Sequence, residues 1–171
     1  ECLNKVRDEL KTQSPYRVID VDGAEADDVI GVLTKKFAPT QKVMILSSDK
    51  DFVQLQVNKN VSQYSPTMKK AIKTENANAQ LKQLILEGDK GDGIPNILSN
   101  DSTIVDGIRQ KALTKVRLAE LMNTDIATDG SDDLKRNWSR NKQLIDLGDI
   151  PQTIVDSIID TYENKIGRAH V

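Results

Sequence analysis

The sequence contains very little cysteine, histidine or aromatic residue. Its 171 residues include one cysteine, Cys2, and one histidine, His170, and aromatic residues make up 4%. A single cysteine excludes a disulfide framework within the chain and a zinc site built from clustered cysteines. A single histidine, one residue from the end, argues against serine–histidine or cysteine–histidine catalysis and against a histidine-ligated metal. Any chemistry of this chain must therefore use carboxylates, lysines or hydroxyls.

Long apolar runs and a large charge excess are also missing. Hydrophobic residues make up 37% of the chain and charged residues 29%, and the formal net charge is −2. No stretch approaches the roughly 20 apolar residues of a membrane helix, and no secretory signal pattern is present. The scarcity of aromatics argues against a single-strand stacking platform. We therefore expect a soluble, cytoplasmic protein without a membrane partner, with a length that fits one average domain.

The first half of the chain alternates between strand and helix patterns. The apolar run Lys42–Ser47 is typical of a strand buried on both faces of a parallel sheet, and Tyr16–Asp22 and Val61–Tyr64 are predicted as further strands. Helices are predicted over Ala24–Phe37 and Asp49–Gln56. This alternation predicts a partial α/β, parallel-sheet core over residues 1–88.

From about Gln80 the pattern changes to helices only. A glycine-rich turn, Gly88–Pro95, precedes helices that are predicted over Ile104–Gln110, Leu113–Met122, Asp132–Leu147 and Gln152–Tyr162. An all-helical region is therefore expected over residues 89–165. Residues 166–171 have no helix or strand pattern and look like a translated sequencing adapter. We interpret them as a non-native tail, so His170 carries no functional weight.

Acidic residues gather in three places along the chain. Glu25, Asp27 and Asp28 start a predicted helix, Asp49 and Asp51 follow the buried strand, and Asp89 and Asp92 lie in the glycine-rich turn. Ligands bind at the carboxyl ends of parallel strands, where the first two clusters would meet if their strands are neighbours. Like charges about 4 Å apart cost roughly 4 kcal/mol per pair at an effective dielectric near 20. Such a cluster is tolerable only if cations fill it.

Oxygen ligands without histidine or cysteine favour Mg²⁺ or Mn²⁺ over zinc. Enough carboxylates for two ions suggest two-metal phosphodiester chemistry. Each cluster also has a structural alternative. Acids in a first helical turn are favoured by the helix dipole and by capping, Asp49 could be a helix N-cap, and the third cluster could be a turn. The joint occurrence of the three clusters favours the metal site.

Three segments resemble, in order and spacing, the motifs of the structure-specific 5′ nucleases. They are Gly23-Ala-Glu-Ala-Asp-Asp28, Ile45-Leu-Ser-Ser-Asp-Lys-Asp-Phe52 and Gly88-Asp-Lys-Gly-Asp-Gly-Ile-Pro95. That family includes flap endonucleases and the 5′ nuclease domains of DNA polymerases, and the likeness is greatest to the bacteriophage ribonuclease H and 5′–3′ exonuclease branch. The resemblance implies a PIN/5′-nuclease-like core followed by a helix–three-turn–helix DNA-binding region.

The resemblance also implies an activity. The family's members hydrolyse phosphodiesters of RNA primers or DNA flaps in replication, as metal-dependent 5′–3′ exonucleases or flap endonucleases. Two Mg²⁺ ions, or Mn²⁺, activate water for this reaction. The implied substrate is a duplex, a flap or an RNA–DNA hybrid. A single-strand-binding protein or a sliding clamp would be a protein partner of a monomeric enzyme, located in the host cytoplasm if phage-encoded.

The same resemblance assigns roles to individual residues. Asp27 and Asp49 match ligands of a first metal, Glu25 and Asp28 match acids that ligate or orient it, and Asp51, Asp89 and Asp92 match the second-metal group. Asp27, Asp49, Asp51 and Asp92 are the expected catalytic residues. Nucleic-acid contacts are expected at Lys90, Gly91, Gly93, Gly107, Arg109 and Lys111. Arg109 departs from the glycine that the family usually has there, which puts the close backbone–phosphate approach in doubt.

Further metal-site aspartates of the family come from sequence before the first motif. We therefore expect this chain to be inactive, or nearly so, on its own. Two alternatives remain open from the sequence. The chain could be a non-catalytic duplex-DNA-binding module whose acids are structural, or it could belong to another acid-lined α/β nuclease such as a PIN-type ribonuclease.

Overall fold

The computed structural model describes residues 2–164, so the predicted tail at 166–171 and His170 lie outside the described residues. The elements are α1 (Cys2–Gln13), α2 (Ala26–Phe37), β1 (Val43–Leu46), the 3₁₀ helix η1 (Asp51–Val57), β2 (Val61–Ser65), β3 (Lys70–Ile72), α3 (Ala77–Glu87), α4 (Lys115–Met122), α5 (Ile126–Asp129), α6 (Asp132–Ile145) and α7 (Gln152–Asn164). Among these helices, none is long and apolar enough to cross a membrane.

The sheet is small and mixed. Its order is β1-β2-β3, with β1 and β2 parallel and β2 and β3 antiparallel. The α/β class and the parallel pairing of the two predicted apolar strands are confirmed, but the prediction of a purely parallel sheet is wrong. A parallel crossover needs about a dozen residues or more. The short link from Ser65 to Lys70 permits only a hairpin, and Lys69 adopts a positive φ of 51° within it.

Two other predicted elements are wrong within the described part of the chain. Tyr16–Asp22 is irregular rather than a strand, because it pairs with no strand of the sheet, and a strand without a partner leaves its backbone groups unpaired. Ile104–Gln110 forms turns rather than a helix. There the Gly107 N–H donates to the Ile104 carbonyl at 3.1 Å, and Gly107 has a φ of +66°. The left-handed conformation of that glycine interrupts a helical path.

The hydrophobic core has three adjoining clusters. One lies under the sheet and consists of Ala38, Ile45, Phe52, Leu55, Val61 and Leu147. A second joins α3 to α4 and α5 through Leu86, Ile97, Leu121 and Ile126, and a third joins α3 to α6 through Ile85, Ile94 and Ile145. The helical second half is thereby packed against the α/β half.

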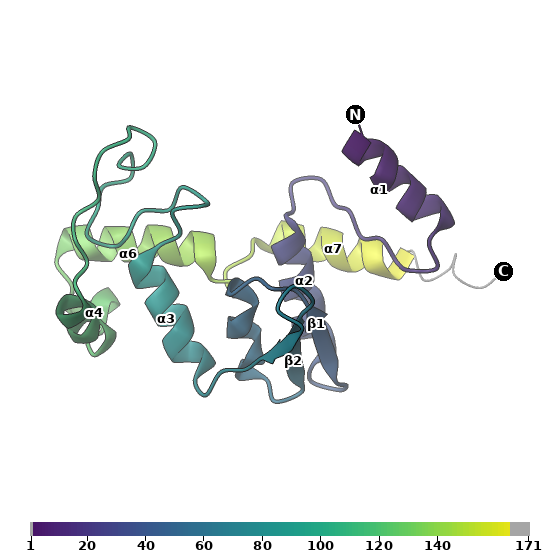
Figure 1. The fold of residues 1–171 in the computed structure, drawn as a ribbon, viewed down its shortest axis with the longest axis horizontal. Helices are drawn as coiled ribbons and strands as arrows, with labels where there is room; N and C mark the ends of the chain where they lie inside the picture. Colours follow the sequence, from purple (N-terminus) through teal and green to yellow (C-terminus); the bar gives the residue numbers. More distant parts are fainter. Residues whose placement is uncertain (1, 165–171) are drawn as a thin grey trace.

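The chain returns to the α/β half after α6. Leu147 enters the core cluster under the sheet, and α7 packs on α2, where the rings of Phe37 and Tyr162 lie 5.1 Å apart. Figure 1 shows α6 and α7 following one another along the longest axis, with α3 and α4 below α6 and the sheet below α7. The helix α1 contributes no buried residue.

Candidate metal centre

The first acidic motif forms the start of α2. Glu25 precedes the helix with an extended backbone, and its N–H donates to Oδ2 of Asp28 at 2.9 Å. Asp28 therefore performs the structural capping role considered from the sequence, while it also lines the pocket described below. The positive end of the helix dipole favours all three acids at this position.

The second acidic motif follows β1 and is held by its own turn. The Asp49 N–H donates to Ser47 Oγ at 3.1 Å, and the Asp51 N–H donates to Asp49 Oδ1 at 3.0 Å. The buried side chain of Gln63, on β2, donates to the carbonyls of Ser47 and Asp49 at 2.9 and 2.6 Å. The backbone that carries Asp49 is therefore tied to the neighbouring strand.

The third motif is a closed turn that only glycine can begin. Gly88 has a φ of +69°, and a Cβ on it would lie 2.5 Å from the Ile94 carbonyl oxygen. The Ile94 N–H donates to the Asp89 carbonyl at 2.7 Å, and the Gly91 N–H donates to Asp89 Oδ1 at 2.7 Å. The turn thus projects Asp89 and Asp92 from a backbone that is closed at its base.

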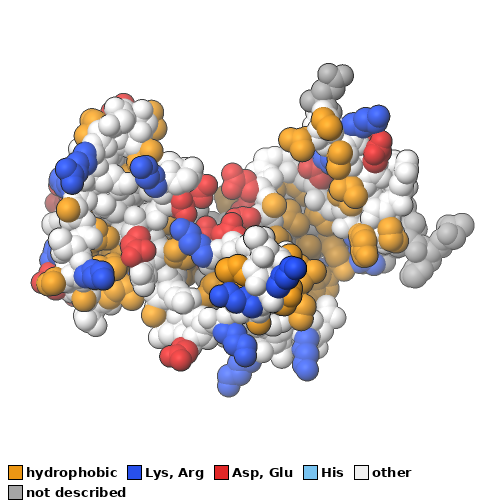
Figure 2. All heavy atoms as spheres, viewed as in Figure 1, with side chains coloured by type: hydrophobic (Ala, Val, Ile, Leu, Met, Phe, Trp, Pro, Cys, Tyr) orange, Lys and Arg blue, Asp and Glu red, His pale blue; other side chains and the backbone are white. Residues whose placement is uncertain are grey.

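The structure brings all seven predicted acids together. A pocket of about 460 Å³ is lined by six of them (Glu25, Asp27, Asp28, Asp49, Asp51 and Asp92), together with residues at the end of α6. The seventh, Asp89, joins Asp51 and Asp92 in a triad, with one carboxylate oxygen from each lying within 4.8 Å of the others. Figure 2 shows acidic side chains gathered in the hollow at the middle of this face.

The crowding of these carboxylates changes their acidity. Partial burial, followed by the nearby charge of Asp49, raises the pKa of Asp51 to about 6. Burial and the charges of Asp49 and Glu25 raise the pKa of Asp27 as well. A hydrogen bond from Lys50 lowers the pKa of Asp89. One ammonium group therefore relieves part of the repulsion, and Asp27 and Asp51 bind a proton more readily than an ordinary aspartate does.

The donor set fits a hard divalent cation. All ligand atoms of the triad are carboxylate oxygens, which suit Mg²⁺ and Mn²⁺, and among residues 2–164 neither a histidine nor a cysteine lines the pocket. The spacing of three oxygens within 4.8 Å of one another would allow a single ion to contact all three. Asp51 belongs to both the triad and the larger pocket and so connects the two groups of acids.

The predicted nucleic-acid contacts fall in two places. Lys90, Gly91 and Gly93 lie in the acidic turn, where Lys90 is exposed and Gly93 lines the pocket. Gly107, Arg109 and Lys111 lie in the loop before α4 and are exposed. The backbone of Lys111 is fixed, because its N–H donates to Ser99 Oγ at 2.9 Å and its carbonyl accepts from Asn96 at 2.9 Å. Their contact with phosphate stays a prediction.

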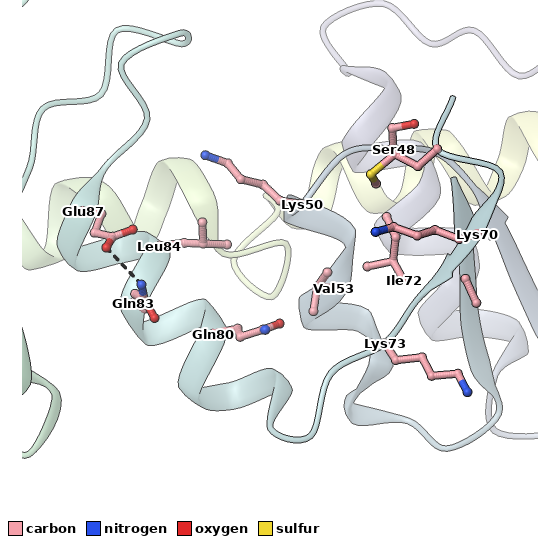
Figure 3. A pocket seen from close by; sticks show the side chains of 12 residues that line it. Ser48, Lys50, Val53, Lys70, Ile72, Lys73, Gln80, Gln83, Leu84 and Glu87 are labelled. Carbon is pink, nitrogen blue, oxygen red and sulfur yellow. Dashed lines mark hydrogen bonds between the residues drawn. The ribbon is translucent and has the colours of Figure 1, made fainter. Parts of the chain in front are cut away.

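Sequence reasoning missed a second cavity next to the acids. It has a volume of about 660 Å³ and lies between the β2–β3 hairpin and α3. Figure 3 shows Lys50 beside η1, Lys70 on the hairpin, and Gln80, Gln83 and Glu87 on α3. The sequence offered one indication of this neighbouring site, because Lys50 lies between Asp49 and Asp51 in the second acidic motif. Lys50 joins the second cavity to the acidic triad, because it lines that cavity and its Nζ lies 2.8 Å from Asp89 Oδ2.

The chain is similar in sequence to known nucleases. Residues 4–85 match the family model described as the 5′–3′ exonuclease, N-terminal resolvase-like domain. The chain is 36% identical, over 96% of its length, to the ribonuclease H of Enterobacteria phage T4. The chain is similar to members of the 5′–3′ exonuclease and flap nuclease family. It is also 37% identical, over 54% of its length, to a 5′–3′ exonuclease of Aquifex aeolicus (strain VF5), another such relative.

The chain spans 56% and 38% of the lengths of these two 5′–3′ exonuclease relatives. Solved structures show the same fold. A mutant T5 5′-exonuclease superposes with a TM-score of 0.61 at 18% identity, covering 94% of this chain and 74% of that one. A T5 protein co-crystallised with metal ions superposes with a TM-score of 0.59 at 19% identity, covering 94% and 68%.

Proposed function

We propose that this chain is part of a divalent-metal-dependent 5′ nuclease that hydrolyses phosphodiesters of RNA primers or DNA flaps. The observation that carries the proposal is the convergence of seven carboxylates from three separate segments on one site. Such a concentration of negative charge is unfavourable unless cations neutralise it. Similarity to the 5′–3′ exonuclease and flap nuclease family supports the same function.

The residues divide into two ligand groups in this proposal. Asp51, Asp89 and Asp92 would hold one ion, and Asp27 and Asp49 a second. Glu25 and Asp28 would support the second ion at the start of α2. Divalent ions bound there would supply an acidified water and neutralise charge on the phosphate. The protein's own contribution is to hold the carboxylates in place and to keep the closed turn from moving.

The substrate in this proposal is a duplex that bears a flap or an RNA segment. Lys90 and Gly93 lie in the turn that carries Asp89 and Asp92, and Lys50 lies between the acids and the second cavity. Two lysines and a glycine would therefore lie next to a phosphate bound at the site. Gly107, Arg109 and Lys111 would contact backbone phosphates of the duplex farther away, as phosphate contacts fix register rather than sequence. The action would take place in the cytoplasm of the host cell, and the enzyme would act as a monomer.

The expectation that this chain is inactive on its own has no support in the assembled site. All seven acids predicted from the sequence are already gathered there. Both the chain and a longer parent protein are therefore assayed for cleavage.

The test is cleavage of a 5′-labelled flap and of a labelled RNA–DNA hybrid, with Mg²⁺, with Mn²⁺ and with EDTA. We expect metal-dependent cleavage that falls at least about 100-fold in Asp49→Asn and in Asp92→Asn, as is typical when a charge-stabilising group is lost. Asp160→Asn is the matched control, because Asp160 is exposed on α7 and lies outside the pocket. Cleavage that survives EDTA or both active-site substitutions would reject the proposal. Metal-independent duplex binding without cleavage by the parent would favour the DNA-binding module.

A further inference from the structure

Helix α6 carries two fully polar side chains into the interior of the molecule. Asn137 and Asn141 are one helical turn apart and are 3% and 0% exposed. Each donates to two backbone carbonyls from other parts of the chain. Buried amides are tolerated when such bonds satisfy them, so the partners of each residue indicate what it holds in place.

Asn141 joins the two sides of the acidic turn. Its Nδ2 donates to the carbonyls of Ile85 at 2.7 Å and Pro95 at 2.9 Å. Ile85 is in the last turn of α3, where carbonyls lack helical partners, and Pro95 directly follows the turn. Neighbouring bonds from Gly88 N–H to the Leu84 carbonyl and from Ile97 N–H to the Leu86 carbonyl complete this end of α3. Asn141 therefore closes the base of the loop that carries Asp89 and Asp92.

Gln54 makes the corresponding link to the third member of the triad. Its buried Nε2 donates to the carbonyls of Asp51 at 2.9 Å and Ile145 at 3.0 Å. Its Oε1 accepts from the Leu147 N–H at 2.9 Å. The backbone of Asp51 is thus tied to the end of α6.

We propose that Asn141 and Gln54 are positioning residues that make α6 the common support of the Asp51–Asp89–Asp92 triad. The inference rests on the proposed metal centre. The triad oxygens come from two segments, and each of these two amides ties one of the segments to α6. The oxygens lie within 4.8 Å of one another, a separation that a single cation can span. Substitution of residues that hold metal ligands in position typically lowers metal affinity by about 10–100-fold.

The matched control is Asn137, whose Nδ2 donates to the carbonyls of Ile97 at 2.8 Å and Ser99 at 3.3 Å. It has the same residue type, helix and burial, but its partners lie beyond the acidic turn. The test compares Asn141→Leu and Asn137→Leu in the full chain. Mn²⁺ affinity is measured by electron paramagnetic resonance, and thermal unfolding is measured in EDTA.

We expect both substitutions to lower the unfolding midpoint in EDTA, because each removes two hydrogen bonds from a buried amide to backbone carbonyls. Only Asn141→Leu should weaken Mn²⁺ binding, by about tenfold or more. Equal weakening in both variants, or unchanged affinity in Asn141→Leu, would overturn the inference while leaving the metal centre intact. Failure of the unmodified chain to bind Mn²⁺ would reject the metal centre itself and this inference with it.

Two further variants keep the test decisive if Asn141→Leu does not fold. Asn141→Ser retains a single donor and can satisfy at most one of the two carbonyls. Gln54→Met keeps the side-chain length but removes all three hydrogen bonds. We expect each to weaken Mn²⁺ binding by several-fold, and affinity equal to that of the unmodified chain in both would overturn the inference.

Discussion

The ammonium group of Lys50 lies 2.8 Å from Oδ2 of Asp89, so the acidic triad has a cation of its own on one side. This hydrogen bond lowers the pKa of Asp89 and raises the pKa of Lys50. The ammonium thus binds one of the two carboxylate oxygens of Asp89, a member of the triad. Lys50 would therefore have to release this oxygen before Asp89 could contribute both of its oxygens to a bound ion.

Removing this competitor should strengthen metal binding. We expect Lys50→Met to tighten Mn²⁺ binding by up to about fivefold, because an exposed ion pair of this kind contributes no more than about 1 kcal/mol. The Lys50 side chain is 59% exposed, which keeps the effect small. Lys70→Met is the control, since Lys70 lines the same neighbouring cavity but forms no ion pair with the triad. Equal or weaker Mn²⁺ binding by Lys50→Met, measured calorimetrically, would show that the ammonium does not compete.

The raised pKa of Asp51 predicts an unusual pH dependence of stability without metal. Its pKa is about 6 in the folded protein, whereas the ordinary pKa of an aspartate is 3.8. The folded state therefore binds more protons between these values, and stability falls as pH rises through this window. We expect the thermal unfolding midpoint in EDTA to rise as the pH is lowered from 7.5 to 5. The lowered pKa of Asp89 acts below this window and does not oppose the trend.

Asp51→Asn should remove most of that rise and stabilise the metal-free protein at pH 7.5. With allowance for partial exposure, the gain is about 1 kcal/mol, or about 3 °C in the midpoint. The unfolding midpoint of Asp51→Asn should still rise slightly as the pH is lowered, because the pKa of Asp27 is also raised. A midpoint in EDTA that is lower in Asp51→Asn than in the unmodified protein at pH 7.5 would contradict this account.

Bound metal should stabilise the folded protein at the pH at which the ionised acids destabilise the metal-free form. Saturating Mg²⁺ or Mn²⁺ should raise the unfolding midpoint at pH 7.5, and EDTA should reverse the rise. At a free metal concentration of about 100 times Kd, the stabilisation is about 2.7 kcal/mol, or roughly 8 °C. Asp92→Asn should lose most of this response, whereas Asp160→Asn should keep it. A midpoint that does not respond to either metal would argue that the acids bind no ion.

The glycine that begins the acidic turn should be irreplaceable. We expect Gly88→Ala to destabilise the protein by about 3 kcal/mol or more, because a Cβ would lie 2.5 Å from one carbonyl oxygen and 2.6 Å from another. Gly107→Ala is the control, since it has a similar φ of +66° but no atom within 4 Å of the added carbon. It should cost only the conformational strain of about 1 kcal/mol. Denaturant unfolding would separate the two, and equal losses would contradict the close contact at Gly88.

The acids of the site could be predicted from the sequence because each lies at a local landmark. Asp27 and Asp28 begin a helix, Asp49 and Asp51 follow an apolar strand, and Asp92 lies in a glycine-rich turn. Helix starts, strand ends and glycine turns are specified by neighbouring residues. The reason expected for the convergence of the first two clusters was wrong, because Tyr16–Asp22 forms no strand. The acids at the start of α2 reach those after β1 because α2 packs on β1 and η1.

The supports of the site could not be predicted in the same way. Asn141 bonds residues that lie 56 and 46 positions away, and Gln54 bonds one that lies 91 positions away. A polar residue in an amphipathic helix gives no sign of such a distant partner. The missed strand β3 and the wrongly predicted strand at Tyr16–Asp22 have the same cause. Whether a β-branched run becomes a strand depends on which neighbour offers an open edge.

The return of the chain after α6 has a consequence for how the molecule can be trimmed. The carbonyl of Leu147 accepts from Lys35 Nζ at 2.5 Å, and α7 lies against the helix that carries Glu25, Asp27 and Asp28. A protease cut behind Asp146 would therefore do more than shorten the C-terminal end. It would remove the contacts of Leu147 and α7 with α2, which carries acids of the pocket, although the product would keep all the predicted metal ligands.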